Sequence, residues 1–215
     1  MAKKLTPENI EAAAQHLENI QSGKTPILNG KGPKEESKST YTTLGTKEKQ
    51  QVYPLIPPND PRLLMQIAPF MDDTLEQYEF ANRKELCEVM YDNMAKYGGL
   101  GLSANQVGLP YRMFIMGGHP QIEDGRVRYV FNPMVNDVSE ESVMLKEGCL
   151  SFPALSYETP RAFRAVAKGF NMYGEPITVE GTELLARALQ HETDHLDGIV
   201  FIDRLSKEDR KLAMK

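Results

Sequence analysis

Several features that would narrow a protein's class are scarce or missing in this sequence. Its 215 residues include only two cysteines, Cys87 and Cys149, which lie far apart in dissimilar contexts. So few cysteines argue against a disulfide framework and favour a reducing compartment. No apolar run approaches the roughly 20 residues of a membrane span, so no membrane association is expected. The basic residues form no block and the net charge is −5, which argues against nucleic acid as a partner.

The N-terminal stretch also lacks the marks of a targeting segment. It has no apolar h-region, and its first arginine is Arg62. Acidic residues interrupt it from Glu8 onwards, whereas transit peptides are rich in arginine and poor in acids. We therefore expect a cytoplasmic protein.

A change in composition divides the chain in two. Thr6-Pro7 predicts the start of a short helix that ends at Gly23. From there to about Gln51 the sequence turns to Gly, Lys, Ser, Thr and Glu without apolar periodicity, which predicts a flexible linker. We therefore expect an N-terminal appendage over residues 1–51 and one folded domain over residues 52–215.

Helices and strands are predicted in separate groups within this domain. The capping-box pattern that begins at Asn82 predicts a helix over residues 82–97, in which Cys87 is a core residue. Another helix begins at Gly181-Thr182, is apolar on two adjacent stripes and ends at Gly198, so it should lie largely buried. A final helix begins at Ser206. Strands are expected over Tyr111–Met116, Arg126–Asn132, Phe163–Tyr173, Ile177–Glu180 and Ile199–Ile202. Because helices and strands do not alternate, we expect an α+β fold, with antiparallel sheets packed around the helix that follows Thr182.

The strongest chemical signal, Gln190-His-Glu-Thr-Asp-His195, lies on that central helix. His191 and His195 are four residues apart, so both imidazoles project from one helix face and can bind one divalent metal. Glu192 stands where it can accept a proton from a water molecule at that metal. The alternative is a pair of helical histidines that pair with nearby acids, and the short pattern alone leaves it open.

A catalytic metal site needs a third protein ligand and an open position. Asp194 points away from the histidine stripe. Cys149 follows Gly148, which allows a tight backbone turn, and a thiolate is a good metal ligand. An ordinary buried thiol explains Cys149 as well. The glycine-rich stretch 99–106 offers close backbone approach to a ligand and ends in the amide side chain of Gln106.

Taken together, three segments resemble the ordered motifs of the peptide deformylases. They are Gly99-Leu-Gly-Leu-Ser-Ala-Asn-Gln106, Glu147-Gly-Cys-Leu-Ser151 and Gln190-His-Glu-Thr-Asp-His195. Three separated motifs in the right order are more specific than any one of them, and the similarity covers about residues 53–205. Two positions depart from the family: Ser103 stands where alanine is common, and Thr193 where an apolar residue is usual.

The resemblance implies a metallohydrolase that removes the N-formyl group from the formylmethionyl end of nascent polypeptides and releases formate. It implies Fe²⁺ as the metal, with Zn²⁺, Ni²⁺ or Co²⁺ as substitutes, and we expect a monomer in transient contact with the ribosome. The implied metal ligands are Cys149, His191 and His195. Glu192 would be the general acid/base, and Gln106 and the backbone N–H of Leu150 would hold the carbonyl oxygen of the substrate.

Further residues are expected to contact the peptide. By resemblance, the groove would be lined by Leu100, Gly101, Glu147 and Gly148. By their positions before the ligands on the central helix, Leu184 and Ala188 are candidates for an apolar pocket that receives the methionine side chain. Arg187 lies between them, and we expect its charged end to be solvated, because long charged side chains keep their heads in water.

Two other functions use the same motif. A zinc endopeptidase would need a different third ligand, usually downstream, and no histidine lies beyond His195. A binding protein with a structural metal would need a fourth ligand. The remaining soft candidates, Cys87, His16 and His119, do not lie in a ligand-like spacing.

Overall fold

The computed structural model describes residues 51–118, 122 and 126–214. The predicted helix from Thr6 to Gly23 and the linker that follows it lie outside the described residues, as do His16 and His119. The elements, in chain order, are η1 (Asp72–Tyr78), α2 (Arg83–Tyr97), β1 (Gly101–Ser103), η2 (Ala104–Val107), β2 (Met113–Met116), β3 (Arg128–Val138), β4 (Ser142–Cys149), β5 (Phe152–Ala162), β6 (Arg164–Phe170), β7 (Pro176–Thr182), α3 (Glu183–Leu196), η3 (Phe201–Arg204) and α4 (Lys207–Ala213).

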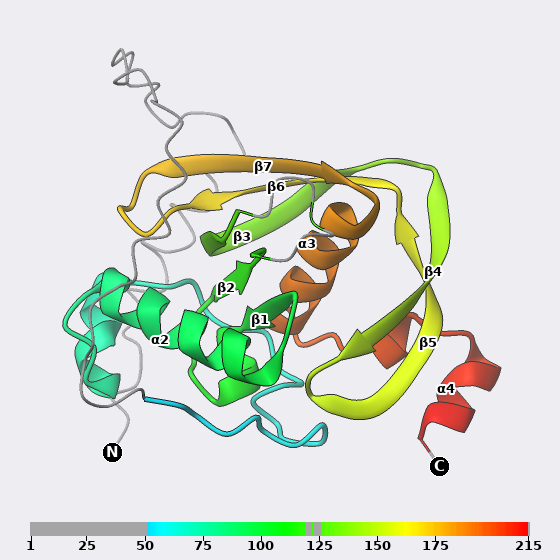
Figure 1. The fold of residues 1–215 in the computed structure, drawn as a ribbon, viewed down its shortest axis with the longest axis horizontal. Helices are drawn as coiled ribbons and strands as arrows, with labels where there is room; N and C mark the ends of the chain where they lie inside the picture. The colour runs from blue at the N-terminus through cyan, green and yellow to red at the C-terminus, as the bar shows by residue number, and fades with distance from the viewer. Residues whose placement is uncertain (1–50, 119–121, 123–125, 215) are drawn as a thin grey trace.

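The strands form a five-stranded sheet in the order β1-β2-β3-β6-β7 and a two-stranded ribbon of β4 and β5 (Figure 1). Every pairing is antiparallel. Helix α3 packs against the sheet and also contacts β5, so it joins the sheet to the ribbon. The predicted class, α+β, is confirmed.

Two of the predicted helices have the predicted ends. The Asn82 side chain accepts a hydrogen bond from the backbone N–H of Glu85, and Gly98 ends α2 in the left-handed conformation, with φ 66°. Eleven of the fourteen residues of α3 are buried, as its two apolar stripes predict, and Gly198 follows it with φ 75°. The interior of the domain therefore holds the helix that carries both histidines.

The ribbon strands β4 and β5 were not predicted. Met144, Leu145 and Lys146 are consecutive and all exposed, so β4 lacks the alternating burial that marks a half-buried strand. The strand predicted over Ile199–Ile202 is wrong. The chain there turns into η3, because the Asp203 carboxylate accepts a hydrogen bond from the backbone N–H of Val200 and so supports a turn. The apolar residues of this segment pack into a small core with the ribbon.

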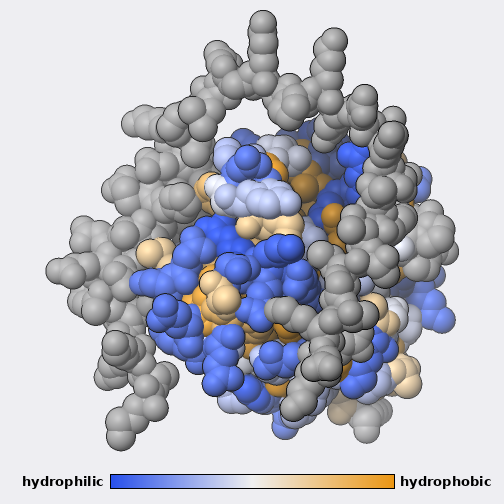
Figure 2. Space-filling model, turned by 60° about the vertical axis from the view of Figure 1, so that its left-hand side comes forward, coloured by the Kyte–Doolittle hydropathy of each residue, from blue (hydrophilic) through white to orange (hydrophobic). Residues whose placement is uncertain are grey.

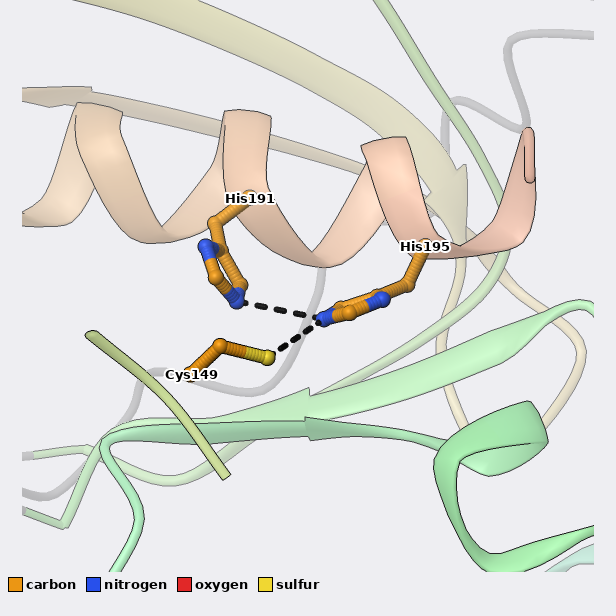
Figure 3. A group of neighbouring side chains, drawn as sticks. All are labelled: Cys149, His191 and His195. Atoms are coloured by element: carbon orange, nitrogen blue, oxygen red, sulfur yellow. Dashed lines mark hydrogen bonds between the residues drawn. The ribbon is translucent and has the colours of Figure 1, made fainter. Parts of the chain in front are cut away.

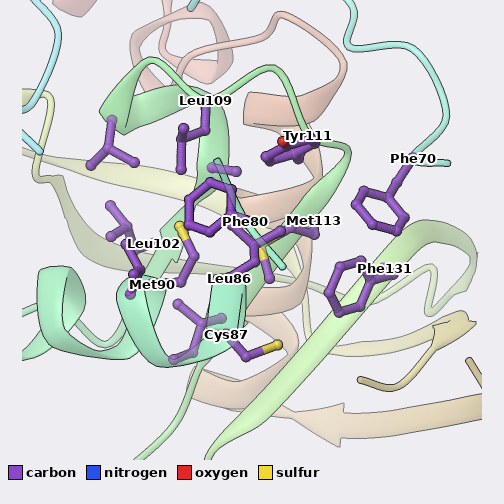
Figure 4. Packing of buried hydrophobic residues seen from close by; sticks show 14 of the residues in the cluster. Phe70, Phe80, Leu86, Cys87, Met90, Leu102, Leu109, Tyr111, Met113 and Phe131 are labelled. Atoms are coloured by element: carbon purple, nitrogen blue, oxygen red, sulfur yellow. The ribbon is translucent and has the colours of Figure 1, made fainter. Parts of the chain in front are cut away.

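The sheet separates two apolar cores. On one face, α2 packs against Met113, Ile115 and Phe131 (Figure 4). On the other, α3 packs against Phe114 and Met116, so successive residues of β2 alternate between the two cores. On the face of the molecule drawn in Figure 2, hydrophilic side chains cover much of the described surface, with apolar ones in patches between them. No helix within the described ranges has the length and apolar character needed to cross a membrane.

Candidate metal centre

Three donor atoms converge where α3 meets the end of β4. The Cys149 Sγ, the His191 Nε2 and the His195 Nε2 lie within 4.8 Å of one another (Figure 3). The His195 Nε2 is 3.2 Å from the Cys149 Sγ and 3.2 Å from the His191 Nε2. The helix supplies the two imidazoles from one face, as their spacing predicts, and the ribbon supplies the thiol.

These separations fit a shared metal ion. Tetrahedral coordination at typical metal–sulfur and metal–nitrogen distances places neighbouring donors about 3.3–3.6 Å apart. The Nδ1 of His191 lies 2.7 Å from the Glu147 carboxylate, so in the neutral form of the ring that would bind a metal the proton sits on Nδ1 and the Nε2 lone pair faces the other donors. Burial holds the pKa of His195 well below its usual value, which keeps that imidazole in the neutral form that binds metals.

The local backbone explains how a strand end brings the thiol to the helix. The register of the ribbon shifts between Gly148, which pairs with Ser156, and Cys149, which pairs with Phe152. Such a bulge bends the strand and re-aims the side chain that follows. Ala154, in the opposing strand, has a φ of 64°. Cys149 therefore sits on an irregular strand end, where its residue keeps some exposed surface while its sulfur lies among buried donors.

Glu147 anchors the imidazole of His191. Its carboxylate lies 2.7 Å from the His191 Nδ1, and it also accepts hydrogen bonds from Arg161 (2.8 Å) and Arg187 (2.7 Å). Burial raises the pKa of Glu147, but the hydrogen bonds from His191 and Arg161 outweigh it and hold that pKa well below its usual value. An ionised carboxylate here fixes the tautomer and orientation of the His191 ring.

The expectation that Arg187 is solvated is wrong. Its residue is 5% exposed, and its guanidinium donates to Glu147 and to the Val143 backbone carbonyl. A buried carboxylate needs a compensating cation. The guanidinium of Arg187 therefore balances the negative charge of Glu147 inside the protein. Asp194 points away from the metal cluster, as predicted, and pairs with Arg161 and Arg204.

The glycine-rich segment lies directly against the carboxylate of Glu192. A side chain at Gly101 would collide with the Glu192 Oε1, so glycine is required for this close approach. On the other side, the Ser103 hydroxyl is 2.7 Å from the Glu192 Oε2. Burial raises the pKa of Glu192, which moves this carboxyl toward the range in which a general base or acid works near neutral pH.

Gln106 directs its amide N–H groups toward the donor cluster. Its Oε1 accepts a hydrogen bond from the Ser103 backbone N–H at 2.8 Å, which fixes the orientation of the amide. Its Nε2 is then 3.2 Å from the Ser151 Oγ and 3.6 Å from the Cys149 Sγ. Asn105 ties the same segment to α3 through a 2.7 Å hydrogen bond to the His195 backbone carbonyl. The loop thus presents a fixed hydrogen-bond donor beside the cluster of Cys149, His191 and His195.

The residues predicted to contact substrate fall into separate environments. Leu100, Leu184 and Ala188 share the apolar core on the α3 face of the sheet. Leu150 directly follows β4, and its side chain packs closely against Gly99. The Glu147 side chain is turned into the buried ion network. A substrate-contact role for these residues stays a prediction.

Part of the supporting structure was not predicted. The sequence alone indicated no role for the hydroxyl of Ser151 or for the side chains of Asn105 and Arg161. Ser151 and Asn105 lie within recognised motifs, but their hydrogen-bond partners, Gln106 and His195, come from other elements. For Arg161, the signal available was charge balance, because a carboxylate that orients a buried imidazole needs cationic neighbours.

A thiol and two imidazoles that converge on an α+β scaffold, with a carboxylate and an amide donor beside them, have the composition of a metal-dependent hydrolase site. Residues 53–211 match the polypeptide deformylase family. The chain belongs to the peptide deformylases, hydrolases that remove the N-formyl group from nascent polypeptides.

Individual relatives agree with this family. The chain is 53% identical over 132 residues to a peptide deformylase of Acidothermus cellulolyticus. The aligned region covers 61% of this chain and 68% of the relative. It is 45% identical over 133 residues to one of Parafrankia, with coverages of 61% and 70%. The crystal structure of peptide deformylase from Thermus thermophilus matches with a TM-score of 0.67 and 36% identity, over 76% of this chain and 91% of that one.

Proposed function

We propose that residues 52–215 form the catalytic domain, and that the cluster of Cys149, His191 and His195 is the centre at which the formyl group is hydrolysed. The observation that supports this most is the spacing of the three donors, which suits a single metal ion. An ordinary buried thiol has no need of two imidazole nitrogens at this separation.

The three donors would hold one divalent cation, for which we propose Fe²⁺, with Zn²⁺, Ni²⁺ or Co²⁺ as substitutes. When bound, such an ion supplies Lewis-acid chemistry, because it lowers the pKa of a coordinated water and polarises the substrate carbonyl. Glu147 would act behind the ligands by holding the His191 ring in place.

Glu192 would move the proton. It accepts a proton from the attacking water as the water oxygen bonds to the formyl carbon. It then delivers a proton to the methionine nitrogen as the bond between that nitrogen and the formyl carbon breaks, so the products are formate and a free amine. General acid–base catalysis of this kind contributes about 10²–10⁴-fold to the rate. Its raised pKa suits both steps.

Gln106 and the Leu150 backbone N–H would stabilise negative charge on the carbonyl oxygen. The Gln106 amide is held with its N–H groups toward the cluster, and a preorganised donor costs no reorganisation during the reaction. We propose that Leu184, Ala188 and Leu100 offer apolar surface to the methionine side chain. Gly101, Gly148 and Glu147 would line the groove along the peptide.

We propose that the substrates are formylmethionyl ends of nascent chains, and that the enzyme acts in the cytoplasm as a monomer in transient contact with the ribosome. An anaerobic assay of formate release from formyl-Met-Ala-Ser, with protein loaded with Fe²⁺, tests the function. The acetyl form of the same peptide is the control, because its extra methyl group hinders the carbonyl. Internal peptide cleavage without formate release would support an endopeptidase, and bound metal without activity would support a binding protein.

A further inference from the structure

Ser103 joins the glycine-rich segment to the residue proposed as general base. It is the last residue of β1 and is 0% exposed. Its hydroxyl lies 2.7 Å from the Glu192 Oε2 and 2.9 Å from the Glu192 backbone carbonyl oxygen. A serine has one hydroxyl hydrogen, so these two oxygens of a single residue compete for the same donor.

The two carboxylate oxygens of Glu192 therefore have different surroundings. Oε2 faces the Ser103 hydroxyl. Oε1 lies against Gly101 and accepts no hydrogen bond from any residue within the described ranges. Because Oε2 already has a hydrogen-bond partner, Oε1 is the oxygen whose lone pairs are open to water or to the leaving amine.

We propose that Ser103 is a positioning residue that holds Glu192 by Oε2 and leaves Oε1 to exchange the proton with water and the leaving amine. This inference rests on the role proposed above for Glu192. The terminal torsion of a glutamate side chain is only broadly restrained, so a buried hydroxyl is an effective means of fixing it. The same hydroxyl lies 2.9 Å from the Glu192 backbone carbonyl oxygen, so Ser103 is packed against α3 beside the carboxylate that it holds.

Ser103→Ala tests the proposal because it removes one oxygen atom and adds nothing to the buried site. We expect kcat to fall about tenfold, the effect of losing one hydrogen bond to a charged group, while KM changes less than about twofold because substrate binding is untouched. Metal content per protein should stay the same. Crystal structures should show one carboxylate orientation in the wild type and more than one in the variant.

Thr159→Val is the matched control. It removes another fully buried hydroxyl, whose hydrogen bond goes to the Tyr157 backbone carbonyl, and it should leave kcat unchanged. If both variants lower kcat equally, the effect of Ser103→Ala is general loss of a buried hydroxyl and the proposal is overturned. An unchanged kcat in Ser103→Ala, or a rise in KM alone, overturns it too.

A double-mutant cycle separates this inference from the role of Glu192. Glu192→Asp withdraws the carboxylate from Ser103, so adding Ser103→Ala should lower kcat by less than about twofold further, because the two effects are coupled. An equal fall in both backgrounds would mean that Ser103 does not act through Glu192. Glu192→Ala, measured alone, tests the proposed role of Glu192 itself. Full turnover in that variant, in which Ser103 is intact, would refute that role.

Discussion

The two cysteines of this chain lie on different elements, and the side chains around their thiols differ in polarity and charge. Cys87, on α2, is 0% exposed and packs among apolar side chains of the first core (Figure 4). Burial raises its pKa to about 12. Cys149, at the end of β4, lies 3.2 Å from an imidazole nitrogen. One residue type thus serves as a core residue in one place and as a candidate ligand in the other, and its neighbours decide which.

The difference extends to the charges behind each thiol. The core around Cys87 is formed by apolar side chains, so it is stabilised by area removed from water. The cluster around Cys149 is backed by Glu147, Arg161 and Arg187, all buried. Burying charges is costly unless each is paired. Here Glu147 is paired with both arginines, and its carboxylate fixes the orientation of the His191 imidazole. The α3 side of the molecule therefore uses polar burial to orient groups, which an apolar core cannot do.

Replacing each cysteine with alanine in turn should show the difference between them most clearly. Cys149→Ala removes one of the three proposed ligands, so we expect bound metal to fall well below one ion per protein and formate release to be nearly abolished. Cys87→Ala should keep both, and lose about 1 kcal/mol or more of stability through a small cavity. Elemental analysis and formate assays measure the first effect, and denaturant unfolding measures the second. Stoichiometric metal in Cys149→Ala would refute its assignment as a ligand.

Glu192→Ala should separate proton transfer from metal binding. All three donors remain, so metal content should match the wild type, while turnover of formyl-Met-Ala-Ser should fall about 10²–10⁴-fold. Glu183→Ala is a control on the same helix, because Glu183 is at its first turn, away from the cluster. Wild-type turnover in Glu192→Ala would mean that a group other than Glu192 accepts and delivers the proton.

The helix side of the site could be predicted more completely than the ribbon side. The spacing of His191 and His195 gives their shared face from helix geometry alone, because both lie within one regular element. Cys149 reaches them only through a bulge at the end of a strand whose exposure pattern gave no strand signal. Its part in the site was therefore suggested by the family motif and could not be derived from periodicity.

Long-range pairing explains the remaining gaps. Arg187 lies on the predicted helix, yet its partner Glu147 is 40 residues away in sequence, so solvation was the natural expectation for an arginine. Ser103 and Glu192 are 89 residues apart. A sequence pattern records which side chain is present, whereas the partner that gives it a role depends on the folded arrangement of β1, β4 and α3.

Glu147→Gln tests the charged network without changing its size. Because the His191 ring loses its anionic partner, metal affinity should fall about 10–100-fold, measured by competition with a chelator. Glu158→Gln, exposed on β5 of the same ribbon, should leave the affinity unchanged. An equal loss in the two variants would indicate that ribbon charge matters in general, rather than the contact with His191.

The same variant has a defined pH dependence. The pKa of Glu147 is lowered in the folded state, so its ionised form stabilises the fold above the unfolded-state pKa of about 4.3. That contribution is lost as the pH falls through the lower, folded-state value. The stability advantage of the wild type over Glu147→Gln should therefore be constant near neutral pH and shrink below about pH 4, as urea unfolding at a series of pH values would show.

Backbone strain provides the smallest test of the contrast between the two regions. The α2 side ends its helix on Gly98, with φ 66°, whereas the ribbon beside Cys149 places Ala154 at φ 64°. A left-handed residue other than glycine costs about 1–2 kcal/mol, partly offset by the greater chain entropy of unfolded glycine. Ala154→Gly should thus stabilise the protein by about 0.5–1 kcal/mol, and Gly98→Ala, where nothing blocks a methyl group, should destabilise it by a similar amount. If the urea midpoint moves in the same direction in both variants, Ala154 is not strained in the folded protein. The backbone of the ribbon would then be no more strained than that of α2.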